Sequence, residues 1–170
     1  MIELRQLNKH LGIEEYEMLQ NIENNENGFM NEVYGMSYEE YEKWLIKQEE
    51  ASIGKNLPQG WIPYTTYFLY DDGTPVGTGR IRHETSAYLQ QVVGAGEIGY
   101  GISKKYRNKG YGNILFQEML KKCIDFGYDK ITLFPHKNNQ ATIKIMLKNG
   151  GKIIGEFKEE KIIIEIPTLC

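Results

Sequence analysis

Several features that mark specialised proteins are scarce in this sequence. Its 170 residues include only two cysteines and five prolines, and the formal net charge is −3. Cys123 lies within a helical pattern and Cys170 is the last residue, so the pair has neither metal-ligand nor redox-motif spacing. We therefore expect reduced thiols in a cytoplasmic protein and no metal site. A basic stripe that would indicate nucleic-acid binding is also missing.

Long apolar runs are absent as well. No window approaches the roughly 18 apolar residues that a membrane helix needs. The first residues, MIELRQL, place Glu3 and Arg5 ahead of any apolar run, which is unlike a signal peptide. We expect a soluble protein without a membrane partner. Its negative charge fits a cationic small partner better than nucleic acid.

The composition that is present is typical of a globular protein. Hydrophobic residues make up 41% of the chain, with twelve tyrosines and six phenylalanines, which argues against wholesale disorder. A chain of this length can bury a core without disulfide or metal staples. We find no internal repeat and no boundary, so we expect one domain over residues 1–170.

Hydrophobic periodicity predicts four helices and seven strands. Apolar residues at spacings of three and four indicate helices over residues 13–23, from the capping box at Ser37 to about Glu50, over 113–126, and from Asn138 or Asn139 to about Asn149. Alternating or β-prone runs indicate strands over residues 1–7, 65–70, 75–83, from Glu97 onward, and over 130–134, 152–157 and 161–166. Residues 24–29 are predicted to be a loop, and 84–96 a connector of uncertain shape.

The chain is organised around the stretch from Glu97 to Gly112, EIGYGISKKYRNKGYG. It runs from an apolar strand through a basic and polar turn to two glycines at the start of a helix. Backbone N–H groups at a helix N-terminus lack helical partners and carry positive partial charge, so a glycine-relieved turn there can approach a phosphate closely. The N–H groups from Asn108 to Gly112 are thus predicted to form a cradle for a diphosphate. The following strand over 130–134 completes a strand, helix, strand unit, which makes the two strands parallel.

Two landmarks in register resemble the GNAT superfamily of N-acetyltransferases. The first is Arg107-Asn108-Lys109-Gly110-Tyr111-Gly112, which is similar to the superfamily's Arg/Gln-x-x-Gly-x-Gly/Ala signature between a strand and a helix. The second is Asn139 followed by a helix that ends in Lys148-Asn149-Gly150. The resemblance covers roughly residues 65–157. It implies an α/β (α+β) fold, with a mixed, twisted sheet of six to seven strands, about four flanking helices, and central parallel strands splayed apart to admit acetyl-coenzyme A.

The resemblance also implies which residues bind acetyl-coenzyme A, the expected co-substrate. Arg107 and Lys109 would add charge at the cradle, the backbone at Ile102 would contact the pantetheine arm, and Asn139 would either bond that arm or cap the last helix. The expected coenzyme-binding residues are Ile102, Arg107, Asn108, Lys109, Gly110, Tyr111, Gly112 and Asn139.

Three further positions concern the chemistry of the amine and the leaving group. Glu97 stands where superfamily members often carry a carboxylate, so it is either a general base or a surface carboxylate at a strand start. His83 either binds or deprotonates the acceptor, or is a buried, hydrogen-bonded histidine. Many superfamily members carry a tyrosine as general acid where this chain has Met146. Departure of the thiolate would then be assisted by Tyr100, Tyr106 or Tyr111, by water, or by nothing.

We therefore expect an acetyl-coenzyme A-dependent N-acetyltransferase that transfers acetyl directly to a primary amine, on a small molecule or a peptide. The alternative is a catalytically weak or inactive domain that binds or senses acetyl-coenzyme A. A nucleotide-binding domain is disfavoured because neither Gly-x-Gly-x-x-Gly nor Gly-x-x-x-x-Gly-Lys occurs around the turn. Exposed strand edges in the C-terminal hairpin make a homodimer possible.

Overall fold

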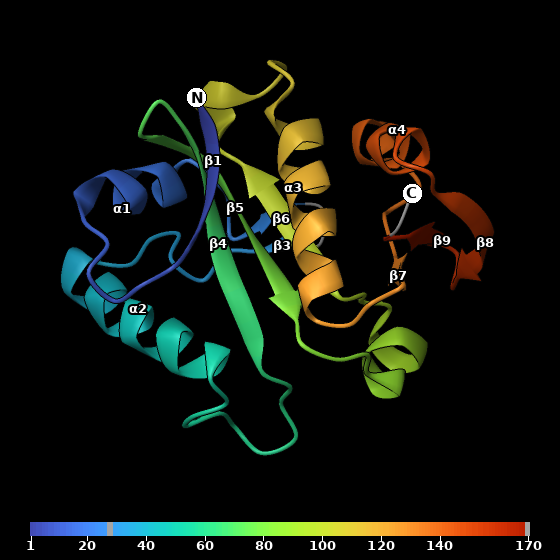
Figure 1. Ribbon diagram of the computed structural model, residues 1–170, viewed down its shortest axis with the longest axis horizontal. Helices are drawn as coiled ribbons and strands as arrows, with labels where there is room; N and C mark the ends of the chain where they lie inside the picture. The colour runs from blue at the N-terminus through green and yellow to red at the C-terminus, as the bar shows by residue number, and fades with distance from the viewer. Residues whose placement is uncertain (27–28, 169–170) are drawn as a thin grey trace.

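Two main sheets, a short two-stranded sheet and four main helices make up the fold, seen in a computed structural model that describes residues 1–26 and 29–168. The first sheet has the order β1-β4-β5-β6 and the second the order β7-β9-β8 (Figure 1). The strands are β1 Ile2–Gln6, β2 Asn25–Glu26, β3 Phe29–Met30, β4 Tyr64–Asp71, β5 Thr74–Arg82, β6 Ile98–Ile102, β7 Lys130–Leu133, β8 Lys152–Phe157 and β9 Lys161–Pro167. The helices are α1 Ile13–Gln20, α2 Tyr38–Ser52, α3 Tyr111–Asp125 and α4 Gln140–Lys148, with a π-helical turn η1 Leu89–Val93 and a 3₁₀ turn η2 Lys104–Tyr106.

Helices cover both faces of the first sheet. Successive side chains of a strand point to opposite faces. In β4, Tyr67 and Leu69 accordingly join the core under α3, whereas Phe68 and Tyr70 join a second core under α1 and α2. Figure 1 shows α1 and α2 on one side of β4 and β5, and α3 on the other. Burial on both faces explains why this strand reads as a nearly unbroken apolar run.

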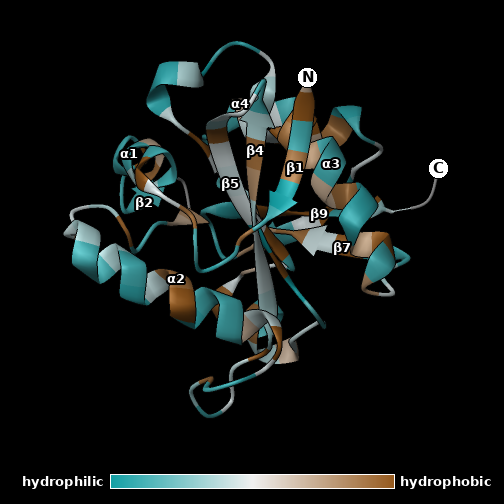
Figure 2. Cartoon of the chain, turned by 60° about the vertical axis from the view of Figure 1, so that its left-hand side comes forward, coloured by the Kyte–Doolittle hydropathy of each residue, from teal (hydrophilic) through white to brown (hydrophobic). Residues whose placement is uncertain are grey.

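Helix α2 begins where its sequence predicts. The Ser37 side chain accepts a hydrogen bond from the Glu40 N–H at 3.1 Å, and the Glu40 carboxylate accepts one from the Ser37 N–H at 3.0 Å. This reciprocal pair satisfies two N–H groups that the helix leaves free. The helix buries Tyr41, Trp44 and Leu45, and its bands of brown and teal in Figure 2 reflect this amphipathic pattern.

The two sheets separate between β6 and β7. Each ladder in the described part of the chain is antiparallel; β6 pairs with β5 and β7 with β9, and no ladder joins β6 to β7. The two strands are linked beside the start of β6, where the Thr132 N–H donates to the Glu97 carboxylate at 3.0 Å. The predicted splay of the two central strands is thus confirmed.

Three predicted boundaries differ from the structure. The first helix ends at Gln20 rather than near Glu23, and the connector 84–96 contains the turn η1. The expected loop 24–29 includes β2 and the start of β3, although its residues 27–28 lie outside the described residues, as does Cys170. Phe29 packs against β6, where side-chain atoms at Gly99 and Gly101 would lie 3.6 and 3.0 Å from its ring. Such a long-range contact leaves no local pattern to predict from.

Gly96 provides a test of how closely the sheets approach. A Cβ atom there would lie 1.9 Å from the Thr132 carbonyl oxygen, which is backbone and cannot swing aside. We expect Gly96→Ala to lower the free energy of unfolding by about 1–3 kcal/mol, measured by urea titration, because the strands must move apart. The matched control is Gly155→Ala, whose Cβ would make an ordinary 3.8 Å contact with Ile163. Equal unfolding midpoints for the two variants would contradict the close approach.

Candidate active site

The turn before α3 has the backbone conformation of an anion-binding site. Gly110 is the N-cap residue of α3, with φ of 87°, and Asn108 also has a left-handed φ of 61°. Glycine adopts such a φ without steric cost, and asparagine tolerates it better than most residues. Within the described residues, no side chain caps α3, so the N–H groups of its first turn stay available.

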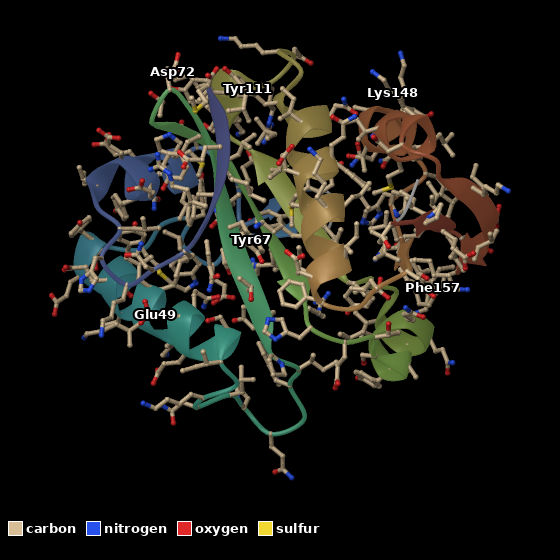
Figure 3. The ribbon with its side chains drawn as sticks, in the orientation of Figure 1. Glu49, Tyr67, Asp72, Tyr111, Lys148 and Phe157 are labelled. Carbon is tan, nitrogen blue, oxygen red and sulfur yellow. The ribbon has the colours of Figure 1, made fainter. Side chains whose placement is uncertain are left out.

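Two tyrosine side chains pack beside this turn and stabilise it. The Tyr111 hydroxyl donates to the Asp71 carboxylate, and this hydrogen bond, followed by burial, raises the pKa of Tyr111. The rings of Tyr106 and Tyr111 meet edge to face with centroids 6.2 Å apart, and the Lys109 ammonium lies 5.8 Å from the Tyr106 centroid. Figure 3 shows Tyr111 beside Asp72 at one end of the first sheet. The Tyr111 hydroxyl is therefore already committed to the fold.

The Arg107 guanidinium points along the end of β6. Its Nε donates to the Ile102 carbonyl oxygen at 3.0 Å, and its terminal nitrogen forms a 3.0 Å ion pair with Glu26 of β2. The guanidinium is thus held by Glu26 and Ile102, and a contribution of Arg107 to the charge of the cradle stays a prediction. Its observed contacts instead fix the turn relative to β6 and β2.

One edge of β6 faces the gap between the sheets. The Ser103 N–H donates to Val76, and the Glu97 carbonyl accepts from Arg82, so odd-numbered residues direct their backbone groups toward β5. Because these groups alternate sides along a strand, those of Ile98, Tyr100 and Ile102 point the other way. This edge runs from the cradle to Glu97 and has no ladder partner in the described chain.

Glu97 lies at the far end of that edge and is only 4% exposed. One carboxylate oxygen accepts from the Thr85 hydroxyl at 3.1 Å and the Gln90 amide at 3.0 Å, and the other from the Thr132 N–H. A carboxylate offers about four lone-pair sites, so these three bonds leave room for one more donor. The structure rules out the surface carboxylate that we considered as an alternative.

A groove of about 590 Å³ opens beside Glu97. Its polar lining includes a second carboxylate, Glu165, which forms a 3.4 Å ion pair with Lys130. Its apolar lining includes Phe134 and Phe157, whose rings meet edge to face at 5.6 Å. In Figure 3, Phe157 lies on the right, lower than Tyr111, so the groove and the cradle occupy different parts of the molecule.

Comparison with protein families and solved structures gives a consistent assignment. The model of the acetyltransferase (GNAT) family matches residues 17–151. The chain belongs to that family. No curated protein sequence matches it. Membership confirms the expected enzyme class, an acetyl-coenzyme A-dependent N-acetyltransferase.

Three solved structures share the fold at low sequence identity. The ribosomal-protein-S5-alanine acetyltransferase of Vibrio fischeri is 15% identical, with a TM-score of 0.69, and the match covers 99% of this chain and 93% of that one. A spermidine N-acetyltransferase chimera from Vibrio cholerae is 18% identical, with a TM-score of 0.66 and coverage of 98% and 95%. The Campylobacter jejuni N-acetyltransferase PseH, solved with acetyl-coenzyme A, is 16% identical, with a TM-score of 0.62 and coverage of 98% and 99%.

This GNAT chain uses Asn139 and Met146 structurally. The Asn139 side chain caps α4 by accepting from the Thr142 N–H at 3.3 Å, so capping, one of the two alternatives, is observed. Met146 is 4% exposed and packs in the main core. Contact between Asn139 and the coenzyme stays a prediction.

His83 lies outside the groove and has its own partners. Its ring nitrogen is 2.7 Å from the Thr65 hydroxyl, and its ring stacks on Phe126 with centroids 4.6 Å apart. The hydrogen bond agrees with the buried, hydrogen-bonded alternative, but the ring is half-buried rather than buried. Contact between His83 and an acceptor stays a prediction without a geometric observation behind it.

Neither a group of metal ligands nor a membrane-spanning helix is found among the described residues. Across residues 1–26 and 29–168, no group of three or more His, Cys, Asp or Glu side chains could hold a metal ion. Over the same residues, no helix is long and apolar enough to span a bilayer.

Several residues of the site were not predicted, because they come from segments whose hydrophobic residues have no regular spacing. Thr85 and Gln90, which hold the Glu97 carboxylate, belong to the connector 84–96. Glu26, which holds Arg107, belongs to the polar segment 24–29. The only signal in either segment was polarity itself, which does not indicate a partner.

The environment of His83 predicts a pH effect on stability. Burial lowers the pKa of His83, so near pH 6 the unfolded chain binds more protons at this position than the folded one. Its contribution to stability is therefore present above the unfolded pKa of about 6.5 and is lost as pH falls below it. We expect His83→Gln to flatten the decrease in unfolding free energy between pH 7 and pH 5, measured by denaturant titration. His10→Gln, which removes an exposed histidine, is the matched control; equal slopes for the wild type and His83→Gln would contradict this assignment.

Proposed function

We propose that the protein transfers the acetyl group of acetyl-coenzyme A to a primary amine by direct attack. The observation that carries this proposal is the arrangement along β6. An anion-binding turn lies at one end of its unpaired edge, and a buried carboxylate beside a groove lies at the other. Binding of a diphosphate, polarisation of a carbonyl and deprotonation of an amine can thus occur along one line.

The turn supplies what a diphosphate needs. The N–H groups of Asn108 to Gly112, with the positive end of the α3 dipole, would hold the phosphate oxygens, and Lys109 would add charge. Arg107 would act mainly by holding the turn, because Glu26 and Ile102 occupy its guanidinium. A structural neighbour, PseH, was solved with acetyl-coenzyme A, which supports the choice of ligand.

The open edge of β6 supplies donors for the reacting carbonyl. The backbone groups of Ile98, Tyr100 and Ile102 face the gap between the sheets, where an extended thioester arm would lie beside them. A preorganised donor to the developing oxyanion is typically worth about 2.7–4 kcal/mol. The backbone of Ile102 would hold the arm nearer the cradle.

Glu97 would accept the proton that the amine loses. Most primary amines are protonated at neutral pH, so a base or a water relay must act before attack. The Glu97 carboxylate lines the groove and retains one site for a further donor. The carboxylates of Glu97 and Glu165 and the rings of Phe134 and Phe157 fit an amine with an apolar segment.

Transfer would not pass through a covalent intermediate on Cys123. Cys123 is fully buried, and burial raises the pKa of its thiol to about 12. The thiol therefore stays protonated at neutral pH and is shielded from substrate.

The proposed acetyl transfer is tested by measuring the release of coenzyme A. The protein is incubated with acetyl-coenzyme A and a panel containing polyamines, aromatic amines, amino acids and peptides, while free thiol is monitored. We expect at least one amine to raise thiol release above the hydrolytic background, with acetylated product visible by mass spectrometry. Tight binding of acetyl-coenzyme A without release for any amine would favour the sensing domain instead.

Gly110→Ala tests whether the cradle binds the diphosphate of coenzyme A. Its left-handed φ of 87° means that Gly110→Ala strains the turn, at a cost of about 1–2 kcal/mol in unfolding free energy. We expect coenzyme A affinity to fall at least tenfold by calorimetry, since the N–H groups change direction. Gly127→Ala, with φ of 86° just beyond the other end of α3, should lose similar stability but retain the affinity. Equal affinities for both variants would exclude the turn as the diphosphate site.

Glu97→Gln tests whether Glu97 is the general base. We expect its turnover to fall by about 10²–10⁴-fold, the usual contribution of general base catalysis, while acetyl-coenzyme A affinity stays intact. Unfolding free energy is measured alongside, because three hydrogen bonds to the carboxylate are altered. Glu118→Gln, on the surface of α3, is the control. Turnover that matches the wild type across the pH range would remove Glu97 from the mechanism.

A further inference from the structure

The side chain of Asn149 joins the two helices that flank the gap between the sheets. Asn149 is the C-cap residue of α4. Its amide nitrogen donates to the Asn113 side-chain oxygen of α3 at 2.9 Å and to the Ile145 carbonyl oxygen of α4 at 2.8 Å. Its amide oxygen accepts from the Gln117 amide nitrogen of α3 at 3.1 Å. In the described part of the chain, both side-chain hydrogen bonds between α3 and the end of α4 thus depend on this one amide.

This amide fits its partners in one orientation. A primary amide has two N–H hydrogens and one carbonyl oxygen, and here both hydrogens are donated and the oxygen accepts. Turning the amide over would bring its oxygen against two acceptors, the Asn113 side-chain oxygen and the Ile145 carbonyl. A carboxylate would lack the hydrogens that these acceptors receive. The network therefore favours asparagine over aspartate at position 149.

The two helices meet next to the cradle. Asn113 and Gln117 are four residues apart, so they lie on one face of α3. Ile145 and Asn149 likewise share one face at the end of α4. Beside these residues, a Cβ atom on Gly112 would lie 3.3 Å from the Cδ1 atom of Ile145. The contact between the helices therefore includes a residue of the cradle.

The two helices belong to different halves of the molecule. Helix α3 follows β6 and covers the first sheet, whereas α4 follows β7 and leads into β8 of the second sheet (Figure 1). The chain just after α4 packs on that second sheet, since a Cβ atom on Gly151 would lie 2.8 Å from Ile164 of β9. In Figure 3, Tyr111 of α3 and Lys148 of α4 both lie at the upper end of the molecule. The Asn149 amide therefore links the halves at the end that carries the cradle.

A second link joins the halves at the start of β6. There the Thr132 N–H of β7 donates to the Glu97 carboxylate. The open edge of β6, Ile98–Ile102, lies between this link and the start of α3. With a link on either side, the distance between the halves along this edge is fixed before a ligand arrives.

We propose that Asn149 is a positioning residue for coenzyme A. This inference rests on the coenzyme site of the proposed function. The Asn149 amide holds α4 at a fixed distance from the first turns of α3, and thereby sets the width of the gap that receives the pantetheine arm. Such preorganisation raises affinity, because less ordering is left to occur on binding. A ligand that contacts the cradle without entering the gap does not depend on this width.

Asn149→Ala tests the inference by comparing two ligands. Coenzyme A has a diphosphate and a pantetheine arm, whereas adenosine diphosphate has the diphosphate without the arm. We expect the variant to bind coenzyme A about tenfold more weakly by calorimetry, an effect of the size of one or two hydrogen bonds. Its affinity for adenosine diphosphate, measured by competition with coenzyme A, should match that of the wild type. An equal loss for both ligands would place the effect on the cradle rather than the gap, and would overturn the inference.

Asn113→Ala gives a second measurement on the same network. It removes the acceptor on α3, so coenzyme A affinity should fall in this variant as well. The double variant Asn113→Ala, Asn149→Ala should bind coenzyme A about as weakly as Asn149→Ala alone, because one hydrogen bond cannot be lost twice. Losses that multiply in the double variant would show that the two residues act separately, which contradicts a single link.

The matched control is Gln20→Ala, at the end of α1. The Gln20 amide also has partners at both ends: its nitrogen donates to the Val33 carbonyl and its oxygen accepts from the Gly35 N–H, each at 2.9 Å. Both Gln20→Ala and Asn149→Ala should lower the unfolding temperature, whereas only Asn149→Ala should weaken coenzyme A binding. A lower unfolding temperature with unchanged coenzyme A affinity in Asn149→Ala would mean a merely structural role, and would also overturn the inference.

These binding measurements separate the inference from the proposed function because they require no acceptor amine. If the wild type and Asn149→Ala bind coenzyme A alike, positioning by Asn149 is wrong while the transferase proposal stands. If the wild type fails to bind coenzyme A, both are wrong. A selective loss of coenzyme A affinity in Asn149→Ala, without turnover of the wild type for any amine, would support positioning by Asn149 and overturn the transferase.

Discussion

The missing ladder between β6 and β7 is the constraint on which the rest of the structure depends. A strand edge inside a protein has N–H and C=O groups that need partners, and burying them unpaired is costly. Here the Thr132 N–H of β7 donates to the Glu97 carboxylate beside the start of β6, and no ladder joins the two strands in the described chain. A side-chain hydrogen bond thus links β6 to β7 at the position where their ladder is missing.

That arrangement explains why unusual residues gather around β6. Gly96 lets the Thr132 backbone approach closely, and Gly110 gives the turn before α3 its left-handed backbone. Between these points lies Tyr100, whose ring packs edge to face on Phe116 of α3.

Sequence reasoning located the elements well and the side-chain partners poorly. The capping box at Ser37, the order of strands and the turn before α3 follow from local rules, and each is present. The pairing of Arg107 with Glu26 could not be predicted, since it joins segments that are remote in sequence and neither has a periodic pattern. An arginine in a motif indicates that a turn is basic. The direction of its side chain, however, depends on which carboxylate the fold brings near.

The same limit applied to Glu97 and Met146. The position of Glu97 at the start of a strand was readable, whereas the Thr85 and Gln90 side chains that hold it come from a connector whose shape no pattern indicates. Met146 was recognisable as a departure from the family, but only the packing of α4 shows that it belongs to the core. Local chemistry can therefore be predicted where it depends on backbone, and less where it depends on packing.

The contact between Phe29 and the glycines of β6 has a mechanical consequence. Gly99 and Gly101 present bare backbone to the Phe29 ring, so no side chain cushions that face of the strand. The opposite face carries the bulky Ile98, Tyr100 and Ile102, which pack toward α3. An aromatic ring from a distant part of the chain thereby supports β6 directly against its backbone, on the face opposite α3, and a larger residue at Gly101 would push the strand away from that ring.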